Sequence, residues 1–270
     1  MEPEKSLDTT AAKAYEKFIL PAFMLPAAKE AIELAVPQAG DKVLDVACGT
    51  GLVARLIAPR VTPGGVIRCL DFDPAMIAVA SELVECPPGV DLTWHCASAL
   101  SMPFDDKEFD MVICLHGLQF MPDFGAALKE MRRVMKPGAR LLIAVWGAID
   151  RCLGHLAVFR GLERQHVTPT AMLKAFVLGE REKLETLAIS SGFNEVRIST
   201  VQGRVRFPSA QHFVEALAAG AVAARHALAG LPESQRAAFM DEMREEFRQY
   251  EDHGGVAPPN EQLVLVARAG

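Results

Sequence analysis

The sequence of 270 residues lacks any dense run of lysine and arginine, any C-x-x-C pair and any long uninterrupted apolar stretch. Phosphate backbones are bound mainly by clustered basic side chains, and here the net charge is −6 and the basic groups, such as Arg132-Arg133, are short and isolated. Nucleic acid is therefore excluded as the expected partner. The longest apolar stretch, 18–28, holds two prolines and is too short to cross a bilayer, so no membrane association is expected.

Metal and secretion signals are also missing. No pair of histidines or cysteines has zinc-ligand spacing, so no metal is predicted. The acidic N-terminus has no apolar signal-peptide core, which favours a cytoplasmic location. In that compartment the cysteines are expected to be reduced, buried thiols. There are six of them: Cys48, Cys69, Cys86, Cys96, Cys114 and Cys152.

Apolar runs and helical spacings alternate regularly through the first half of the chain. This rhythm is typical of parallel βαβ units. The strands are expected at 43–46, 66–70, 91–96, 109–115 and 139–146, with later ones at 194–207 and 262–267. Residues 1–35 read as an N-terminal helical cap segment, 36–147 as a Rossmann-like cofactor-binding core, and 148–270 as helical cap insertions plus the last two strands.

The most informative segment is V43-L-D-V-A-C-G-T-G51. Gly49 and Gly51 lie where a strand turns into a helix, and they let the backbone pass close to a ligand. The glycines alone also fit the dinucleotide pattern G-x-G-x-x-A. Asp45 separates the two interpretations, because a carboxylate repels a pyrophosphate but suits the ammonium and sulfonium charges of S-adenosylmethionine. The alternative is that Asp45 merely caps the following turn.

An acidic residue also ends the second predicted strand. Asp71 comes 20 residues after Gly51, where a carboxylate can accept hydrogen bonds from both ribose hydroxyls of a nucleoside. Nicotinamide and methyl-donor cofactors satisfy this pattern equally. Asp73, followed by Pro74, is predicted to be only the N-cap of the next helix.

Four ordered motifs carry a family resemblance: VLDVACGTG, LDFDPAMIAVA, CASALSMPFDDKEFDMV and ALKEMRRVMKPGARLL. Over about residues 40–147 the sequence resembles class I S-adenosylmethionine-dependent methyltransferases, especially the group that includes the ubiquinone and menaquinone biosynthesis enzymes. The resemblance implies an α/β, Rossmann-like, doubly wound sheet of seven strands with the last strand antiparallel. It implies S-adenosyl-L-methionine as the cofactor and a small molecule as the methyl acceptor.

The resemblance also implies roles for individual residues. Asp45, Ala47, Cys48, Gly49 and Gly51 would surround the methionine part of the cofactor, and Asp71 would hold the ribose. The adenine would lie among Phe72, Met76, Ser98, Ala99 and Leu100. Ser98 departs from many relatives, which have Asp there to accept a hydrogen bond from the adenine amino group, and Ala47 replaces a glycine.

The methyl-transfer side would be lined by Leu115 and His116, which follow the fourth strand. His116 is the first candidate for a general base, needed if the acceptor must lose a proton; the alternative is a loop histidine that only shapes the pocket. His155 and His212 are weaker candidates. Substrate contacts are expected at Tyr15, Phe18, Gln119 and Phe120, although core packing is an equal alternative for the first two.

Two other functions fit parts of the pattern. The glycine loop and Asp71 allow an NAD-dependent enzyme. Ser98 and the lack of an obvious base allow a protein that keeps the cofactor without methylating, as a binding module or a pericyclic catalyst. The segment after the fourth strand has no [DNS]-P-P-[YF] motif, which lowers the reading as an amine methylase of DNA or protein. The identity of the acceptor follows no readable motif, and the hydrophobic surplus allows either an apolar pocket or a homodimer contact.

Overall fold

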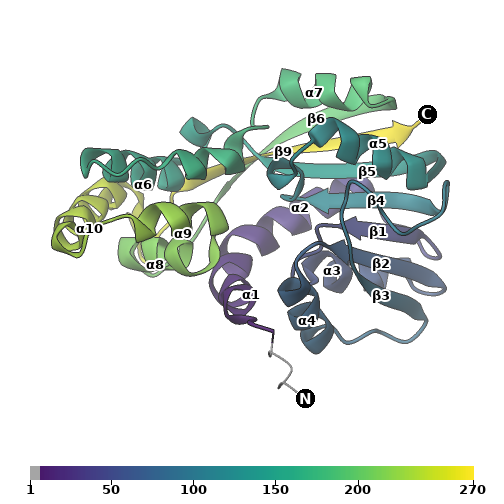
Figure 1. The fold of residues 1–270 in the computed structure, drawn as a ribbon, viewed down its shortest axis with the longest axis horizontal. Coiled ribbons are helices and arrows are strands. Elements are labelled where there is room, and N and C mark those ends of the chain that lie inside the picture. Colours follow the sequence, from purple (N-terminus) through teal and green to yellow (C-terminus); the bar gives the residue numbers. More distant parts are fainter. Residues whose placement is uncertain (1–6) are drawn as a thin grey trace, which may run out of the picture.

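A computed structural model describes residues 7–270; the first six residues of the predicted N-terminal segment lie outside the described part. A sheet of seven strands forms the centre, in the order β3-β2-β1-β4-β5-β9-β6 (Figure 1). Six strands run in the same direction, and β9, which lies between β5 and β6, runs antiparallel to both. The predicted fold class, including the antiparallel last strand, is confirmed. The strands are β1 (Lys42–Val46), β2 (Gly65–Asp71), β3 (Val90–Cys96), β4 (Phe109–Leu115), β5 (Met135–Trp146), β6 (Phe193–Arg204) and β9 (Pro259–Ala269).

Helices cover both faces of this sheet because the central strands are apolar on both sides. One buried cluster joins the sheet to α2 and α3 through Ile32 and Ile57. A second cluster joins the opposite face to α5 and α7 through Met131 and Leu184. The helices that cover the two faces are α2 (Leu25–Ala35), α3 (Leu52–Val61), α4 (Pro74–Leu83), α5 (Phe124–Val134) and α7 (Arg181–Ser190).

A second group of helices lies beyond one end of the sheet, where β6 and β9 extend toward it (Figure 1). It contains α6 (Leu153–Arg164), α8 (Ala210–Gly220), α9 (Val222–Ala229) and α10 (Glu233–Phe247), with the short pair β7 (Glu251–Asp252) and β8 (Gly255–Val256) beside them. Its interior is aromatic: Phe213 lies within 5.7 Å of the rings of Phe23, Phe207 and Phe247. That these helices act as a cap stays a prediction.

The N-terminal segment departs from a plain helix. After α1 (Thr10–Ala14), a π-helical stretch η1 (Tyr15–Met24) contains Pro21, and α2 follows directly. Proline lacks a backbone N–H and clashes with the preceding turn, so the wider π turn accommodates the interruption. The described helices are all too short or too polar to span a membrane.

Two expectations need correction. The strand predicted from 139 begins at Met135, because Met135 pairs with Phe109 across a bulge and Lys136-Pro-Gly138 lies inside the strand. The cysteines were predicted to be buried, but Cys86 and Cys96 are exposed. Cys86 follows the end of α4, and Cys96 is the last residue of β3, an edge strand.

Candidate active site

The loop between β1 and α3 folds tightly. Ala47, Gly49 and Gly51 all have positive φ angles of 58°, 53° and 82°. Glycine adopts this conformation without strain, and Ala47 adopts it at a cost. A Cβ on Gly49 would have one neighbour within 4 Å, Tyr15 Cε1 at 3.9 Å, so this backbone stays open to close approach. Gly51 is different: a Cβ there would lie 2.7 Å from the ring of Trp94.

Asp45 is the penultimate residue of β1, just before this loop, and is 1% exposed. Neither of its carboxylate oxygens has a hydrogen-bond partner. Burial, and then the negative charge of Asp71, raise the pKa of Asp45 well above its ordinary value. A buried carboxyl group without partners is costly, and a cationic ligand group would remove that cost. Its environment fits the ammonium of S-adenosylmethionine and does not fit a phosphate.

Asp71 organises the same loop from the end of β2. One of its oxygens accepts the backbone N–H of Gly49 at 2.9 Å, and the other accepts that of Asp73 at 2.9 Å. Burial is the largest influence and raises the pKa of Asp71, although these hydrogen bonds oppose it. The Asp73 side chain accepts the N–H of Ala75, which confirms the predicted N-cap of α4. Asp71 therefore couples β2 to the glycine loop.

The predicted adenine side lies along the ends of β2 and β3. Phe72 is 80% exposed, a large apolar ring with one face available for packing. Met76 packs beside the small cluster of Ala75 and Val79. Ser98 Oγ accepts the N–H of Leu100 at 3.2 Å, so the hydroxyl that replaces the usual carboxylate already stabilises a turn. Ala99 and Leu100 are partly buried against the sheet.

His116 follows β4 in a left-handed conformation, with φ of 56°. Its ring stacks on Trp146 with 3.7 Å between centroids, and its Nε2 lies 3.1 Å from Oε1 of Gln262. Nδ1 is buried and has no partner. Burial lowers the pKa of His116 to about 3, against the hydrogen bond to Gln262, so the ring is neutral near pH 7.

A second unpartnered polar group follows three residues later, in the short helix η2 (Leu118–Phe120). Gln119 is buried, and both its amide nitrogen and its amide oxygen lack hydrogen-bond partners. Phe120 is 53% exposed, and Leu115 is buried at the end of β4. Since Asp45 pairs with Ile113 in the β1–β4 register, these groups follow neighbouring strand ends.

The N-terminal π-helical stretch closes over the glycine loop. Tyr15 comes next to Gly49, and burial, followed by the charges of Glu16, Asp71 and Asp45, raises the pKa of its hydroxyl. Glu16 accepts a hydrogen bond from Thr50 Oγ1 at 2.5 Å and forms an ion pair with Arg55 at 2.9 Å. Phe18 is 40% exposed, and Lys17 Nζ lies over its ring, 5.0 Å from the ring centre. Core packing therefore does not describe Phe18.

Several of these partners were absent from the sequence-based site. Glu16, Trp146 and Gln262 belong to no motif, and Thr50 lies within the motif at 43–51 but was given no role. Gln262 is 146 residues from the histidine it contacts. Gly117 was missed too: a Cβ there would lie 2.4 Å from the Cβ of Ala47, so the alanine in the loop requires a glycine opposite. Only the clustering of motifs at strand ends could have indicated this pairing.

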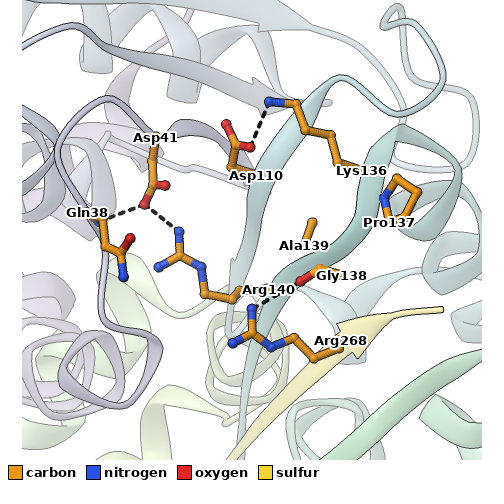
Figure 2. A pocket seen from close by; sticks show the side chains of 9 residues that line it. All are labelled: Gln38, Asp41, Asp110, Lys136, Pro137, Gly138, Ala139, Arg140 and Arg268. Carbon is orange, nitrogen blue, oxygen red and sulfur yellow. Dashed lines mark hydrogen bonds and ion pairs between the residues drawn. The ribbon is translucent and has the colours of Figure 1, made fainter.

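A hollow of about 340 Å³ also opens at the opposite end of the parallel strands, where they begin (Figure 2). Its charged groups are satisfied by one another. Asp41 contacts Arg140 at 2.6 Å and Asp110 contacts Lys136 at 2.7 Å. Arg268 donates to the carbonyl of Gly138 at 3.0 Å. Such saturated pairs leave little demand for a ligand. Within residues 7–270 no cluster of metal-binding side chains occurs.

Comparison with known proteins agrees with the geometry. Residues 44–143 match the family model described as methyltransferase domain. The chain is 31% identical to the chloroplastic 2-phytyl-1,4-beta-naphthoquinone methyltransferase of Arabidopsis thaliana, over 61% of this chain and 68% of that protein. It is 41% identical to the demethylmenaquinone methyltransferase of Staphylococcus carnosus, over 62% of this chain and 73% of that protein.

Among solved structures, phosphoethanolamine N-methyltransferase 2 of Haemonchus contortus, determined in complex with S-adenosyl-L-methionine, superposes with a TM-score of 0.58. The match covers 97% of this chain and 57% of that chain at 19% identity. At this identity the likeness shows the fold.

Proposed function

The chain belongs to the class I S-adenosylmethionine-dependent methyltransferases of the ubiquinone and menaquinone biosynthesis group, and from that premise we propose that it methylates a hydroquinone-like aromatic acceptor. The enzyme uses S-adenosyl-L-methionine and a small-molecule acceptor. The family assignment does not favour the NAD-dependent and non-methylating alternatives. The relatives named above act on naphthoquinone-type compounds according to their names, which supports the acceptor class.

The observation that carries the proposal is the Nδ1 atom of His116, which is buried and has no hydrogen-bond partner after β4. Bound S-adenosyl-L-methionine supplies a methyl group already activated by its sulfonium charge. The protein must then orient the acceptor, exclude water and accept one proton. A neutral histidine accepts a hydroxyl proton at Nδ1, and the unpartnered amide of Gln119 can orient an acceptor oxygen.

Proton transfer to such a weak base needs help from the reaction itself. Burial lowers the pKa of His116 to about 3, whereas a phenolic hydroxyl has a pKa of about 10. The hydroxyl becomes more acidic as electron density moves from the acceptor to the methyl group. We therefore expect Nδ1 of His116 to accept the hydroxyl proton during methylation of the acceptor rather than before it.

The cofactor residues belong to the same proposal. Asp45 binds the ammonium group, Asp71 and the loop 47–51 hold the methionine and ribose, and Phe72, Met76 and Ser98–Leu100 pack around the adenine. Tyr15, Phe18, Gln119 and Phe120 face the acceptor side. The cap segments, 1–35 and the helices of 148–270, select the acceptor. The acidic composition supports a small molecule over nucleic acid. A cytoplasmic location, the absence of membrane association and a homodimer stay sequence-based predictions.

The test is transfer of labelled methyl to 1,4-dihydroxynaphthalene, compared with the oxidised 1,4-naphthoquinone and with an aromatic amine. We expect label in the reduced form, because only it carries the hydroxyl and an electron-rich ring. Equal labelling of the amine, or no labelling of the dihydroxynaphthalene, would overturn the acceptor class. Calorimetric titration with S-adenosyl-L-methionine checks cofactor binding separately.

The role of His116 is tested with His116→Asn, since asparagine tolerates the left-handed backbone at this position. We expect kcat to fall by roughly 10²–10⁴-fold, the usual contribution of a general base. The Kd for S-adenosyl-L-methionine should stay within about twofold. An unchanged kcat at saturating acceptor would assign the histidine to pocket shape alone.

A further inference from the structure

A buried glutamine from the last strand links the proposed base to the N-terminal segment. Gln262 lies on β9 between its two neighbours, opposite Trp146 of β5 and Val201 of β6. It is 3% exposed. Its side chain contacts His116, 146 residues away, and the backbone of Ala27, 235 residues away.

The two ends of this amide have fixed roles. Gln262 Nε2 donates to the carbonyl oxygen of Ala27 at 3.0 Å. A carbonyl oxygen can only accept a hydrogen bond, so the nitrogen must lie on that side and the oxygen Oε1 must face His116. Turning the amide over would place two oxygens against each other in a buried site. The backbone of α2 therefore decides which end of Gln262 the histidine meets.

The orientation of the amide in turn decides where the histidine carries its proton. Oε1 of Gln262 can only accept, and it lies 3.1 Å from Nε2 of His116. In the neutral ring one nitrogen carries the hydrogen and the other carries a lone pair. Nε2 therefore carries the hydrogen, and Nδ1, which has no partner, carries the lone pair.

The ring is also held against rotation. It stacks on Trp146 with an interplanar angle of 21°. Trp146 and Gln262 face each other across the β5–β9 pair, so one strand pair provides both the stacking surface and the hydrogen-bond acceptor. The backbone N–H of His116 adds a further tie to Ala144 of β5 at 2.8 Å.

We propose that Gln262 is a positioning residue: anchored by the carbonyl of Ala27, it keeps the proton of His116 on Nε2 and leaves Nδ1 as the proton acceptor. The catalytic consequence rests on the function proposed above. The tautomer itself does not, because it follows from the three hydrogen-bonding atoms. The N-terminal segment thereby contributes to the state of the base through the hydrogen bond from Gln262 to Ala27.

The test compares the wild type with Gln262→Met, which keeps the length of the side chain and removes both polar atoms. Nitrogen NMR of histidine-labelled protein distinguishes a protonated ring nitrogen from one with a lone pair. We expect the wild-type His116 in the Nε2–H form and the variant with a mixed or reversed population. Gln202→Met, at an exposed site on the neighbouring strand β6, is the matched control and should leave the spectrum unchanged.

Kinetics provide the second readout. We expect Gln262→Met to lower kcat by 10-fold or more while the KM for S-adenosyl-L-methionine changes less than threefold. A wild-type protein with the proton on Nδ1 would overturn the proposal even if the variant fails to fold, and so would a folded variant with the wild-type spectrum and kcat. If the expected tautomer is found but no acceptor is methylated, the positioning role stands and the proposed acceptor class fails.

Discussion

The two ends of the parallel strands in the central sheet carry similar residues that are used in opposite ways. Where the parallel strands begin, Asp41 and Asp110 are each paired with a basic side chain (Figure 2). Where the strands end, Asp45 and the Nδ1 atom of His116 are buried without partners. Buried polar groups are normally satisfied, and leaving one unsatisfied costs about 1–3 kcal/mol. The end where the strands begin therefore contributes stability. The end where the strands finish has a lower stability because its polar groups are left for a ligand to satisfy.

The largest expected effect comes from Asp45→Asn, which removes the charge and preserves the shape. Breaking a buried ion pair costs about 3–5 kcal/mol, so affinity for S-adenosyl-L-methionine should fall on the order of a thousandfold. Titration calorimetry measures this loss. Affinity close to that of the wild type would show that Asp45 does not bind the cofactor. The two ends of the strands would then no longer differ in function.

The same variant should be more stable without ligand. The pKa of Asp45 is raised in the folded protein, so folding is favoured below the unfolded pKa and loses free energy as pH rises toward the folded one. At pH 7 the wild type therefore bears a cost that the asparagine lacks. Urea unfolding at pH 7 should give a higher midpoint for Asp45→Asn.

The matched change at the other end of the strands, where they begin, is Asp41→Asn. Its carboxylate contacts Arg140 and accepts the N–H of Gln38 at 2.7 Å, and both ion-pair partners are mostly buried. We expect the free energy of unfolding to fall by about 3 kcal/mol, the lower end for breaking a buried pair. The Kd for S-adenosyl-L-methionine should stay within twofold. Loss of S-adenosyl-L-methionine binding in a folded variant would show that the two ends of the strands do not act independently.

Two buried histidines should each contribute a loss of stability in acid, whereas the raised pKa of Asp45 acts in the opposite direction. Burial lowers the pKa of His116 to about 3 and that of His155 to about 4. Because an unfolded histidine titrates near 6.5, stability is complete above that pH and is lost as pH falls toward the folded values, at about 1.4 kcal/mol per pH unit for each histidine. Urea unfolding from pH 7 to 5 measures the slope.

His155→Phe should remove the contribution of this histidine, about 1.4 kcal/mol per pH unit. The ring lies among Phe23, Phe176 and Phe213, which can surround another aromatic ring. The exposed His212→Phe is the control and should leave the slope as it is. A slope that is the same in all three proteins would show that these histidines are not buried as the structure has them.

The smallest expected effect concerns the cover over the glycine loop. Glu16→Gln weakens the contacts to Thr50 and Arg55, and we expect affinity for S-adenosyl-L-methionine to fall by about tenfold, or ~1.4 kcal/mol. Glu33→Gln removes a comparable ion pair with Arg60 on α2 and α3 and should leave affinity unchanged. Equal losses in both variants would indicate a general effect of charge.

Sequence patterns predicted what depends on neighbours along the chain. The alternating strands and helices, the loop after β1 and the N-cap at Asp73 each have a local signature, and the structure contains them. The first four residues of β5, which begins at Met135, were missed because proline and glycine ordinarily stop regular structure, whereas here a bulge admits them. Proline within a helical run likewise concealed the π turns of η1.

Contacts between distant segments left no such trace. Glu16 meets Thr50, and Gln262 meets both His116 and Ala27, only after the sheet has formed and the N-terminal segment has packed on it. Asp45 was predictable as a residue beside the loop, but its lack of any partner is a property of the packed interior. The sequence thus indicated which residues gather, and only the fold shows which of them remain unsatisfied.

The π-helical stretch that carries Tyr15 and Glu16 has a kinetic consequence. A molecule bound beside Gly49 would lie next to Tyr15 of this stretch, so we expect its entry and release to depend on movement of the stretch. Spent cofactor would then leave at a rate set in part by that movement. Pro21, held within the widened turns, lies in the segment that would have to bend.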